Sequence, residues 1–365
     1  MNIALPQLQR GTQRAGAAQH RCHVVTLSWG RGADWARYVE AHSDGTLFHS
    51  LGWRNAVRDS FEHEPEYLMA LRGGRMVGVL PMFLVRGPMI GRMLVSVPYA
   101  VGGGILADDE EAAAALFAEA RRRAGELRCA MIDFRSERAW IPGLPVVEPY
   151  VGFERGLPRD AAQVALWLPR KARAVVRNAR EKFGLTCEFE ASALRIVWEL
   201  YCRNMRRLAS INYPYRFFER LFDEFRERCW ICVARRAGRP VAGLVSFLFR
   251  DRVMPYFFGC EEEARSCGAA SFLYSCVMER GAAEGFRVFD FGLSRRDNTG
   301  SCDFKRFHGF EPRPLAYQRY FVESKKQVDL APTNPAFELV RRVWPHLPMA
   351  VTRPAGAFLS QFVPG

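Results

Sequence analysis

The chain contains no apolar run that is long enough to cross a membrane. A helix needs roughly 20 apolar residues to span a bilayer, whereas the longest candidate, residues 76–85, has ten and contains Pro81. The first 23 residues lack the apolar segment of a secretory signal, and they carry three arginines and no acidic residue. We expect residues 1–23 to form a disordered tail, with a transit peptide as the alternative, on a globular cytoplasmic protein.

Several familiar catalytic and metal-binding patterns are also missing from the sequence. The ten cysteines include one C-x-x-C, from Cys229 to Cys232, and no second pair follows it at the spacing of a zinc ribbon. Residues three apart on a strand point to opposite faces, so we expect structural thiols in a reducing cytosol, with no metal site and no disulfides. No Ser-His-Asp set or G-x-S-x-G motif is legible, which disfavours a covalent serine mechanism.

What the chain does have is length and positive charge. Its 365 residues suit two domains, and a content of 49% hydrophobic and 25% charged residues is typical of a globular protein. The 52 basic residues exceed the 39 acidic ones by 13. This balance favours anionic partners such as nucleic acid, nucleotide-linked precursors or an acidic membrane surface.

The two halves of the chain repeat one pattern of predicted elements. A glycine turn at Gly74 and another at Gly238 are each flanked by strand-like segments, as in a hairpin. A helix with an apolar stripe follows each hairpin and leads into a strand that carries an aspartate. The distance from stripe to aspartate is 17 residues in both halves, from Leu116 to Asp133 and from Leu273 to Asp290. This spacing predicts a duplicated α/β unit with mixed sheets in α+β-like layers, divided into residues 24–158, residues 159–325 and a helical tail at 326–365.

Several segments resemble the FemAB-like proteins. The segment FDFGLS at 289–294, followed by GSCDFKRFHGF at 300–310, is similar to the closing motif of that family. Its members are tandem acetyltransferase-fold (GNAT) enzymes, and the best known move an amino acid from a charged tRNA onto an amine of a peptidoglycan precursor. Four further segments look closer to a branch associated with bacterial exopolysaccharide and PEP-CTERM sorting clusters: LFHSLGW at 47–53, VSVPY at 95–99 with Gly102 and Gly103, PRKARAVVR at 169–177, and NPAFELVRRVW at 334–344.

The resemblance, which covers roughly residues 30–350, implies an acyl- or aminoacyltransferase. It would move an activated acyl group onto an amine of a cell-envelope or exopolysaccharide precursor, a nucleotide- or lipid-linked sugar, with no DNA partner. The implied donor is aminoacyl-tRNA, and acyl-CoA is the alternative because loop 265–270 fits the R-x-x-G-x-A pyrophosphate loop of CoA-dependent acetyltransferases. Two other functions stay open: a CoA-dependent N-acyltransferase acting on an amino sugar, and a non-catalytic accessory protein that binds an anionic precursor or polymer.

The candidate catalytic residues lie near the end of the second unit. The resemblance places Lys305 beside the reacting acyl group, where an ammonium stabilises developing negative charge. Asp290 and Asp133 are flanked by apolar residues, so burial would raise the pKa of either carboxyl and make it a proton acceptor, and pairing with arginine is the alternative. Asp303 lies on the same side as Lys305 if the segment is extended, as a catalytic partner or simply as its ion partner. A structural role is expected for His308.

Two regions are candidates for binding phosphate. The first is a predicted helix that begins after Pro169 and ends before Gly184, on which Arg170, Arg173, Arg177 and Arg180 form one stripe. The second is the 265–270 loop, where Arg265, Gly268 and Ala270 precede a helix whose N-terminal amides suit a diphosphate. We also place Arg306, next to Lys305, in the substrate-binding set. A plain solvated surface is the alternative for the arginine stripe.

The C-terminal segment is predicted to be helical and amphipathic. Asn334 and Pro335 suit a helix start, and Arg341, Arg342 and Arg353 combine with later apolar residues such as Phe358 and Phe362. We expect this segment to dock on the second unit, and contact with the inner membrane is the alternative.

Overall fold

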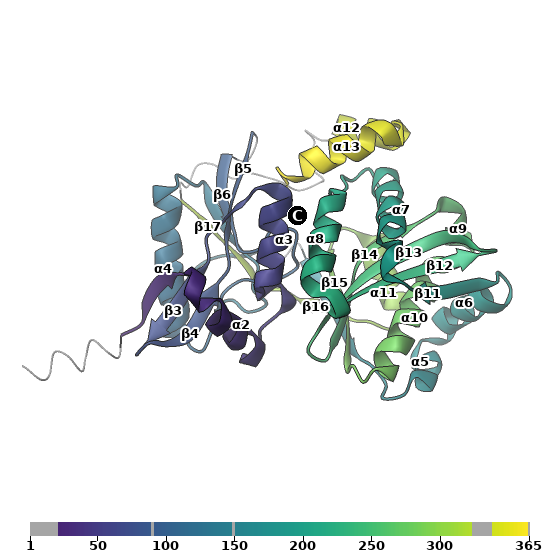
Figure 1. The fold of residues 1–365 in the computed structure, drawn as a ribbon, viewed down its shortest axis with the longest axis horizontal. Coiled ribbons are helices and arrows are strands. Elements are labelled where there is room, and N and C mark those ends of the chain that lie inside the picture. Colours follow the sequence, from purple (N-terminus) through teal and green to yellow (C-terminus); the bar gives the residue numbers. More distant parts are fainter. Residues whose placement is uncertain (1–20, 89–90, 148–149, 323–337, 364–365) are drawn as a thin grey trace, which may run out of the picture.

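The computed structural model describes residues 21–88, 91–147, 150–322 and 338–363. The chain forms two α/β lobes that lie side by side, the first drawn in purple and blue and the second in teal and green (Figure 1). Within the described ranges, no helix combines the length and the apolar character that a bilayer-spanning segment requires.

The first lobe contains two sheets, with strand orders β1-β3-β4-β7 and β2-β5-β6-β8-β17-β9. Its elements are β1 (His23–Thr26), η1 (Trp29–Arg31), α2 (Gly32–Ala41), η2 (Leu47–His49), α3 (Leu51–Phe61), β2 (Glu64–Pro65), β3 (Leu68–Arg72), β4 (Arg75–Leu80), β5 (Phe83–Gly87), β6 (Gly91–Val95), β7 (Leu106–Ala107), α4 (Glu110–Glu126), β8 (Met131–Phe134) and β9 (Val146–Val147).

The second lobe is built on one sheet, with strand order β11-β12-β13-β14-β15-β10-β16. Its elements are β10 (Tyr150–Gly156), α5 (Ala161–Trp167), α6 (Arg170–Glu181), β11 (Leu185–Phe189), η3 (Ala191–Ala193), α7 (Leu194–Arg207), α8 (Tyr215–Phe225), η4 (Arg226–Arg228), β12 (Cys229–Arg236), β13 (Arg239–Phe249), β14 (Arg252–Cys260), α9 (Glu262–Ser266), α10 (Ala269–Ala283), β15 (Val288–Arg295), α11 (Thr299–Phe307) and β16 (Pro312–Pro314), and the chain continues through β17 (Tyr317–Phe321).

The two lobes repeat one chain path. In the second lobe, hairpin β12–β13 leads to β14, helix α10 and β15, and β15 pairs in parallel with β14. In the first lobe, hairpin β3–β4 leads through β5 to β6, helix α4 and β8, and β8 pairs in parallel with β6. The difference lies at Pro81, because the apolar run at 76–85 is divided between β4 and β5, which belong to separate sheets. Proline has no N–H for a ladder hydrogen bond, which explains the break.

The lobes exchange one strand each. Strand β10 pairs antiparallel with β15 of the second lobe, and β17 pairs antiparallel with β8 of the first. The sheets therefore do not divide at residue 158, where the sequence suggested a boundary. In each sheet the exchanged strand lies opposite an aspartate, with Arg319 facing Asp133 and Glu154 facing Asp290.

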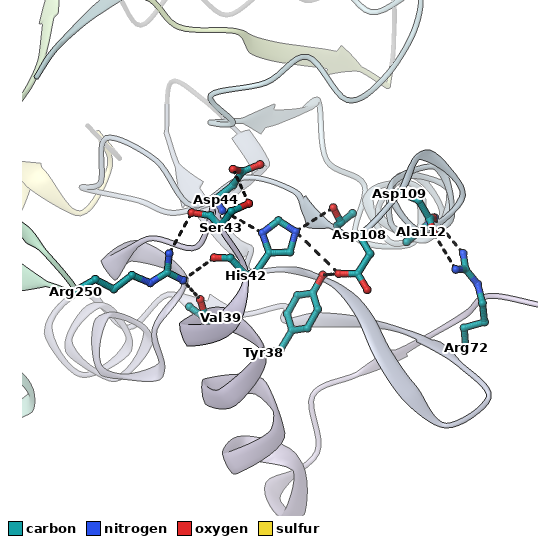
Figure 2. A network of polar contacts seen from close by, with 11 residues as sticks. Tyr38, Val39, His42, Ser43, Asp44, Arg72, Asp108, Asp109, Ala112 and Arg250 are labelled. Carbon is teal, nitrogen blue, oxygen red and sulfur yellow. Dashed lines mark hydrogen bonds and ion pairs between the residues drawn. The ribbon is translucent and has the colours of Figure 1, made fainter.

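An aromatic seam joins the lobes. Trp53 of α3 packs edge-on against Phe217, Phe247 and Tyr256 of the second lobe. Trp53 and the two phenylalanines belong to one core that extends through both lobes, and Tyr256 packs against it. Arg250, in the turn between β13 and β14, adds a polar clamp. Its guanidinium donates to the carbonyls of Val39 (2.7 Å), His42 (2.6 Å) and Ser43 (3.1 Å) at the end of α2 (Figure 2). These contacts hold the lobes in one arrangement, because a buried apolar seam and a multiply bonded guanidinium both resist separation.

The C-terminal helices α12 (Glu338–Val343), η6 (Trp344–His346) and α13 (Met349–Ser360) lie across the second lobe and reach the junction beside α3 and α8 (Figure 1). Trp344 Nε1 donates to the Ser210 carbonyl (3.1 Å), and Asn212 Nδ2 donates to the Arg353 carbonyl (3.1 Å). The expected docking on the second lobe is therefore present, whereas Asn334, Pro335 and the tail at 1–20 lie outside the described residues.

Candidate active site between the lobes

The parallel strands β14 and β15 diverge after a short paired stretch. Their register covers only Arg252 with Val288 and Val253 with Phe289. Beyond it, a cavity of about 300 Å³ lies between the separated ends, lined by Pro255 to Phe257 of β14 and Phe291 to Leu293 of β15. We name this space the aromatic cavity. Its remaining lining residues are Tyr99, Ala100, Val101, Arg135, Tyr150, Tyr201, Tyr213 and Tyr317, so both lobes contribute to it.

Hydrogen bonds fix several phenol groups of the aromatic cavity. Tyr256 donates to the Tyr99 carbonyl (2.7 Å), Tyr317 to the Val101 carbonyl (2.6 Å), and Tyr99 to the Ser360 carbonyl of α13 (3.0 Å). Burial raises the pKa of all three and raises that of Tyr213 to about 12, so the phenols stay neutral at physiological pH. These phenols give the cavity a fixed, uncharged aromatic lining, to which Arg135 adds one positive charge.

A second, polar cavity of about 310 Å³ adjoins it. It is lined by Asp290, Arg252 and Arg313 of the second lobe, and by the 102–104 glycine loop and residues 135–138 of the first. The glycine loop is tightly packed, since a side chain at Gly104 would overlap Ser136. Val101 and Arg135 line both cavities, so the two spaces share one wall.

Asp290 lies in the wall of the polar cavity, immediately before the residues that line the aromatic one. It is half-buried, and its Oδ1 accepts from the Gly292 amide (2.8 Å). No described residue forms an ion pair with it, because Arg252 and Arg313 bind Glu154 instead (2.6 and 3.4 Å). Burial raises the pKa of Asp290, the Gly292 amide and the Arg252 charge offset part of this shift, and Glu137 and Glu154 add to it. A carboxylate with a raised pKa is a suitable proton acceptor.

Asp133 has the opposite surroundings although it occupies the equivalent strand position. Its oxygens accept from Arg135 (3.1 Å) and Arg319 (3.0 Å). Burial alone would raise the pKa of Asp133, but the two guanidinium groups outweigh it and lower that pKa. Asp133 is thus a permanent counter-ion, and it orients Arg135, which also donates to the Ala100 carbonyl (3.0 Å).

Lys305 lies behind β15, on helix α11. The helix begins where the Asn298 side chain accepts from the Ser301 amide (3.1 Å), so the segment is helical and not extended as the sequence suggested. Lys305 Nζ is buried and donates to the carbonyls of Leu293 (2.9 Å) and Gly292 (3.4 Å), which line the aromatic cavity. Burial lowers the pKa of Lys305 to about 8, and the nearby Asp290 charge opposes that shift.

The helical turn directs Asp303 and Arg306 away from the Lys305 ammonium. Both side chains are largely exposed, and they pair with each other (3.3 Å) on the outer side of α11. The expectation that Asp303 partners Lys305 is therefore wrong, because residues two apart on a helix point in different directions. His308 is buried, with Nδ1 2.7 Å from the Phe304 carbonyl, and its Nε2 has no hydrogen-bond partner among the described residues.

Three of the four arginines in the predicted stripe on α6 line a separate cavity. Helix α6 buries Ala172, Val176 and Ala179, while Arg170 is exposed at its start. Arg173, Arg177 and Arg180 line a space of about 240 Å³ together with Ser275 and Glu279 of α10. Arg180 pairs with Glu279 (3.1 Å), whereas neither Arg173 nor Arg177 has an ion-pair partner among the described residues.

The 265–270 loop has little room for a diphosphate. Gly268 has a positive φ of 71° at the start of α10, and Val175 of α6 lies 2.6 Å from the place where a side chain on it would begin. Ala269 and Ser271 are buried, Ala270 is half-buried, and Arg265 is exposed. Helix α6 therefore packs over much of the helix N-terminus that the sequence pattern offered as a phosphate site.

Several residues of the site were not predicted from the sequence. Arg135 lies two residues after Asp133, so alternation along the strand is a local signal that would have found it. Arg252, Arg313 and Glu154 come from separate strands, and they meet only because β10 joins the second sheet. The tyrosines of the aromatic cavity likewise lie far apart in sequence.

Comparisons with known proteins show a likeness that begins in the second lobe. Residues 170–306 match the family model described as an acetyltransferase (GNAT) domain. None of the curated proteins that were compared matches the chain.

Solved structures extend the likeness over both lobes. FemX superposes with a TM-score of 0.64 at 12% identity, covering 87% of this chain and all of that one. A tandem GNAT protein from the clavulanic acid biosynthesis pathway has a TM-score of 0.53 at 14% identity, covering 84% and 100%. L-PGS from Bacillus licheniformis has a TM-score of 0.51 at 13% identity, covering 84% and 99%. The chain has the tandem GNAT-like fold that its sequence predicted.

Proposed function

We propose that this protein transfers an acyl or aminoacyl group from an activated donor to an amine. The observation that carries the proposal is the position of Asp290, in the wall of the polar cavity and directly before the β15 residues that line the aromatic one. The polar cavity offers a proton acceptor with a raised pKa, and the aromatic cavity lies between diverging strands and is lined mostly by uncharged side chains. The match of residues 170–306 to a GNAT domain supports an acyltransferase.

In the proposed reaction the acceptor amine lies in the polar cavity and the acyl carbonyl of the donor reaches it through the aromatic cavity. The neutral amine attacks the carbonyl carbon, the new C–N bond forms, and the bond from that carbon to the donor's oxygen or sulfur breaks. Asp290 takes the proton that the amine loses and returns it to the leaving group. Because the base needs to be ionised and yet basic, a raised carboxyl pKa suits this role.

Lys305 is proposed as a positioning residue in this scheme. Its ammonium holds the carbonyls of Gly292 and Leu293, which fixes the curvature of β15 beside Asp290. The charge of Asp290 raises the pKa of Lys305, so the two groups are electrostatically coupled.

The proposed donor is an aminoacyl ester in preference to acyl-CoA. A GNAT fold is compatible with acyl-CoA, but the packing of Val175 against Gly268 leaves the 265–270 loop poorly shaped for the diphosphate of that donor. We propose an anionic cell-envelope or exopolysaccharide precursor as acceptor, which the net charge of +13 and the arginines of α6 favour.

The test is a transfer assay with purified protein, charged tRNA or acyl-CoA as donor, and nucleotide-linked amino sugars as acceptors. Asp290→Asn should lower kcat by about a hundredfold, the usual scale for loss of a general base. Asp34→Asn is the matched control, since Asp34 of α2 is about half-exposed, lines neither cavity, and pairs with Arg37 alone among the described residues. Unchanged turnover in Asp290→Asn would overturn the role of Asp290, and ligand binding without turnover by the unaltered protein would overturn the proposed activity.

A further inference from the structure

Helix α13 has one docked face and one unpartnered face. Thr352, Gly356 and Ser360 are spaced by four residues and are all buried against the protein. Gly356 lies so close to Asn212 that a side chain there would overlap it, and the Tyr99 hydroxyl donates to the Ser360 carbonyl (3.0 Å). The helix is therefore held in one fixed rotation.

That rotation turns large apolar side chains toward solvent. Val351 (48% exposed) and Phe358 (62%) lie seven residues apart, hence on one side of α13, while Leu359 (38%) borders that side and Val363 (37%) follows the end of the helix. We name these four residues the C-terminal apolar face. With Val343 (44%), they make up five of the nine large hydrophobic residues that are exposed in the described part of the chain. A concentration of this kind on one short segment indicates a binding surface, because single exposed apolar residues are normally scattered.

The charge around this face identifies the partner that it fits. Residues 338–363 contain Arg341, Arg342 and Arg353 against a single acidic residue, Glu338. Arg342, on the helix that precedes α13, is exposed, whereas the Arg353 guanidinium lies over the Trp198 ring (5.3 Å). An apolar helix face with an exposed arginine on the preceding helix, in a chain with a net charge of +13, is complementary to a lipid surface with anionic headgroups.

We infer that the C-terminal apolar face docks the protein on an anionic lipid bilayer. The apolar side chains enter the boundary between headgroups and acyl chains, and Arg342 contacts the lipid phosphates. Because the end of α13 contacts Tyr99, a lining residue of the aromatic cavity, docking brings that cavity close to the bilayer. The docking inference does not depend on the proposed function. A docked transferase would act on a lipid-linked substrate, and this consequence alone rests on the proposed function.

The experiment measures flotation of the full-length protein with vesicles of phosphatidylglycerol and phosphatidylcholine, compared with phosphatidylcholine alone. The unaltered protein should bind the anionic vesicles more tightly, and added salt should weaken the binding. The double variant Phe358→Ser with Leu359→Ser should bind at least about tenfold more weakly, since each apolar side chain contributes to partitioning. Arg342→Glu should weaken binding to the anionic vesicles alone. Leu166→Ser is the control, because Leu166 of α5 is 77% exposed and lies outside the C-terminal helices.

Three results would overturn the inference. The first is no flotation of the unaltered protein with anionic vesicles, and the second is equal flotation of the double variant. The third is a dimer in light scattering that the double variant converts to a monomer, which would assign the face to a second copy of the chain. All of these are measured without turnover, so they are distinguishable from a failure of the transferase assay.

Discussion

Asp133 and Asp290 occupy equivalent positions in the two lobes, yet Arg319 faces the first across its strand pair and Glu154 faces the second. Side chains directly opposite on antiparallel strands lie on the same face of the sheet and interact. The duplication thus produced one carboxylate that is neutralised and one that is electrostatically strained. Strain of this kind is more typical of a functional group than of a stabilising one.

The two aspartates should respond oppositely to the same substitution. Asp133→Asn leaves two guanidinium groups without their partner and should destabilise the protein by about 3 kcal/mol, the usual range for breaking a buried pair. Asp290→Asn removes a carboxylate whose folded pKa is raised, so at neutral pH it should leave stability unchanged or increase it. Urea unfolding of both variants measures the difference.

The pH dependence has a definite sign for each aspartate. The contribution of Asp133, whose folded pKa is lowered, is present above its unfolded pKa and is lost as pH falls. The contribution of Asp290, whose folded pKa is raised, is present below its unfolded pKa and is lost as pH rises through the folded value. The advantage of Asp290→Asn over the unaltered protein should therefore grow from acid toward neutral pH. A stability difference between Asp290→Asn and the unaltered protein that stays constant with pH would contradict a raised pKa for Asp290.

Lys305 should give transfer an alkaline limit. Its pKa of about 8 means that the ammonium, and its contacts with the Gly292 and Leu293 carbonyls, are lost as pH rises past that value. The folded pKa lies below the unfolded one, so this group raises stability over the same pH range in which activity falls. In Lys305→Arg the limit should move to higher pH, because a guanidinium stays charged. Lys182→Arg, at the exposed end of α6, is the control, and a kcat that stays flat to about pH 10 in the unaltered protein would refute this role.

The arginines of α6 should bind an anionic substrate. Arg173→Glu with Arg177→Glu should weaken acceptor or tRNA binding and flatten its dependence on salt between about 50 and 200 mM, because fewer phosphates are then engaged. Arg216→Glu with Arg220→Glu on α8 is the control, with the same four-residue spacing on another helix. Equal affinity and an equal salt slope in the α6 variant would leave the stripe as a plain solvated surface.

Two helical glycines should respond oppositely to alanine. Gly356→Ala places a methyl group against Asn212 and should destabilise the docking of α13 by about 1–3 kcal/mol, the range for overpacking. Gly125 of α4 has no neighbour within 4 Å of its would-be side chain, so Gly125→Ala should stabilise the protein by about 0.5–1 kcal/mol through helix propensity. Hydrogen exchange of the α13 amides measures the first effect and thermal unfolding the second. Unaltered α13 protection in Gly356→Ala would contradict the close packing.

The sequence predicted features that depend on local pattern. The spacing to Asp133 and Asp290 revealed the duplication, and the periodic arginines of α6 revealed its exposed side. Features that depend on distant partners were missed. Arg319 lies 186 residues from Asp133, and no local pattern announces that pairing. The sequence predicts a role for Lys305 in transfer. It does not predict the direction of that side chain or its separation from Asp303, because both depend on the helix that begins at the Asn298 cap.

The strand exchange has a consequence for how the chain is made. Strand β8 leaves the ribosome long before β17, its neighbour in the finished sheet, so the first lobe carries an unpaired strand edge while the second is still being synthesised. An unpaired edge is a template for wrong association. Strand β10 is likewise synthesised well before β15, its partner in the second lobe. The sheets that contain β8 and β10 therefore reach their full strand order only when most of the chain has emerged. A fragment cut after either lobe would expose such an edge, and co-translational chaperone binding should be greatest in the interval between the two strands.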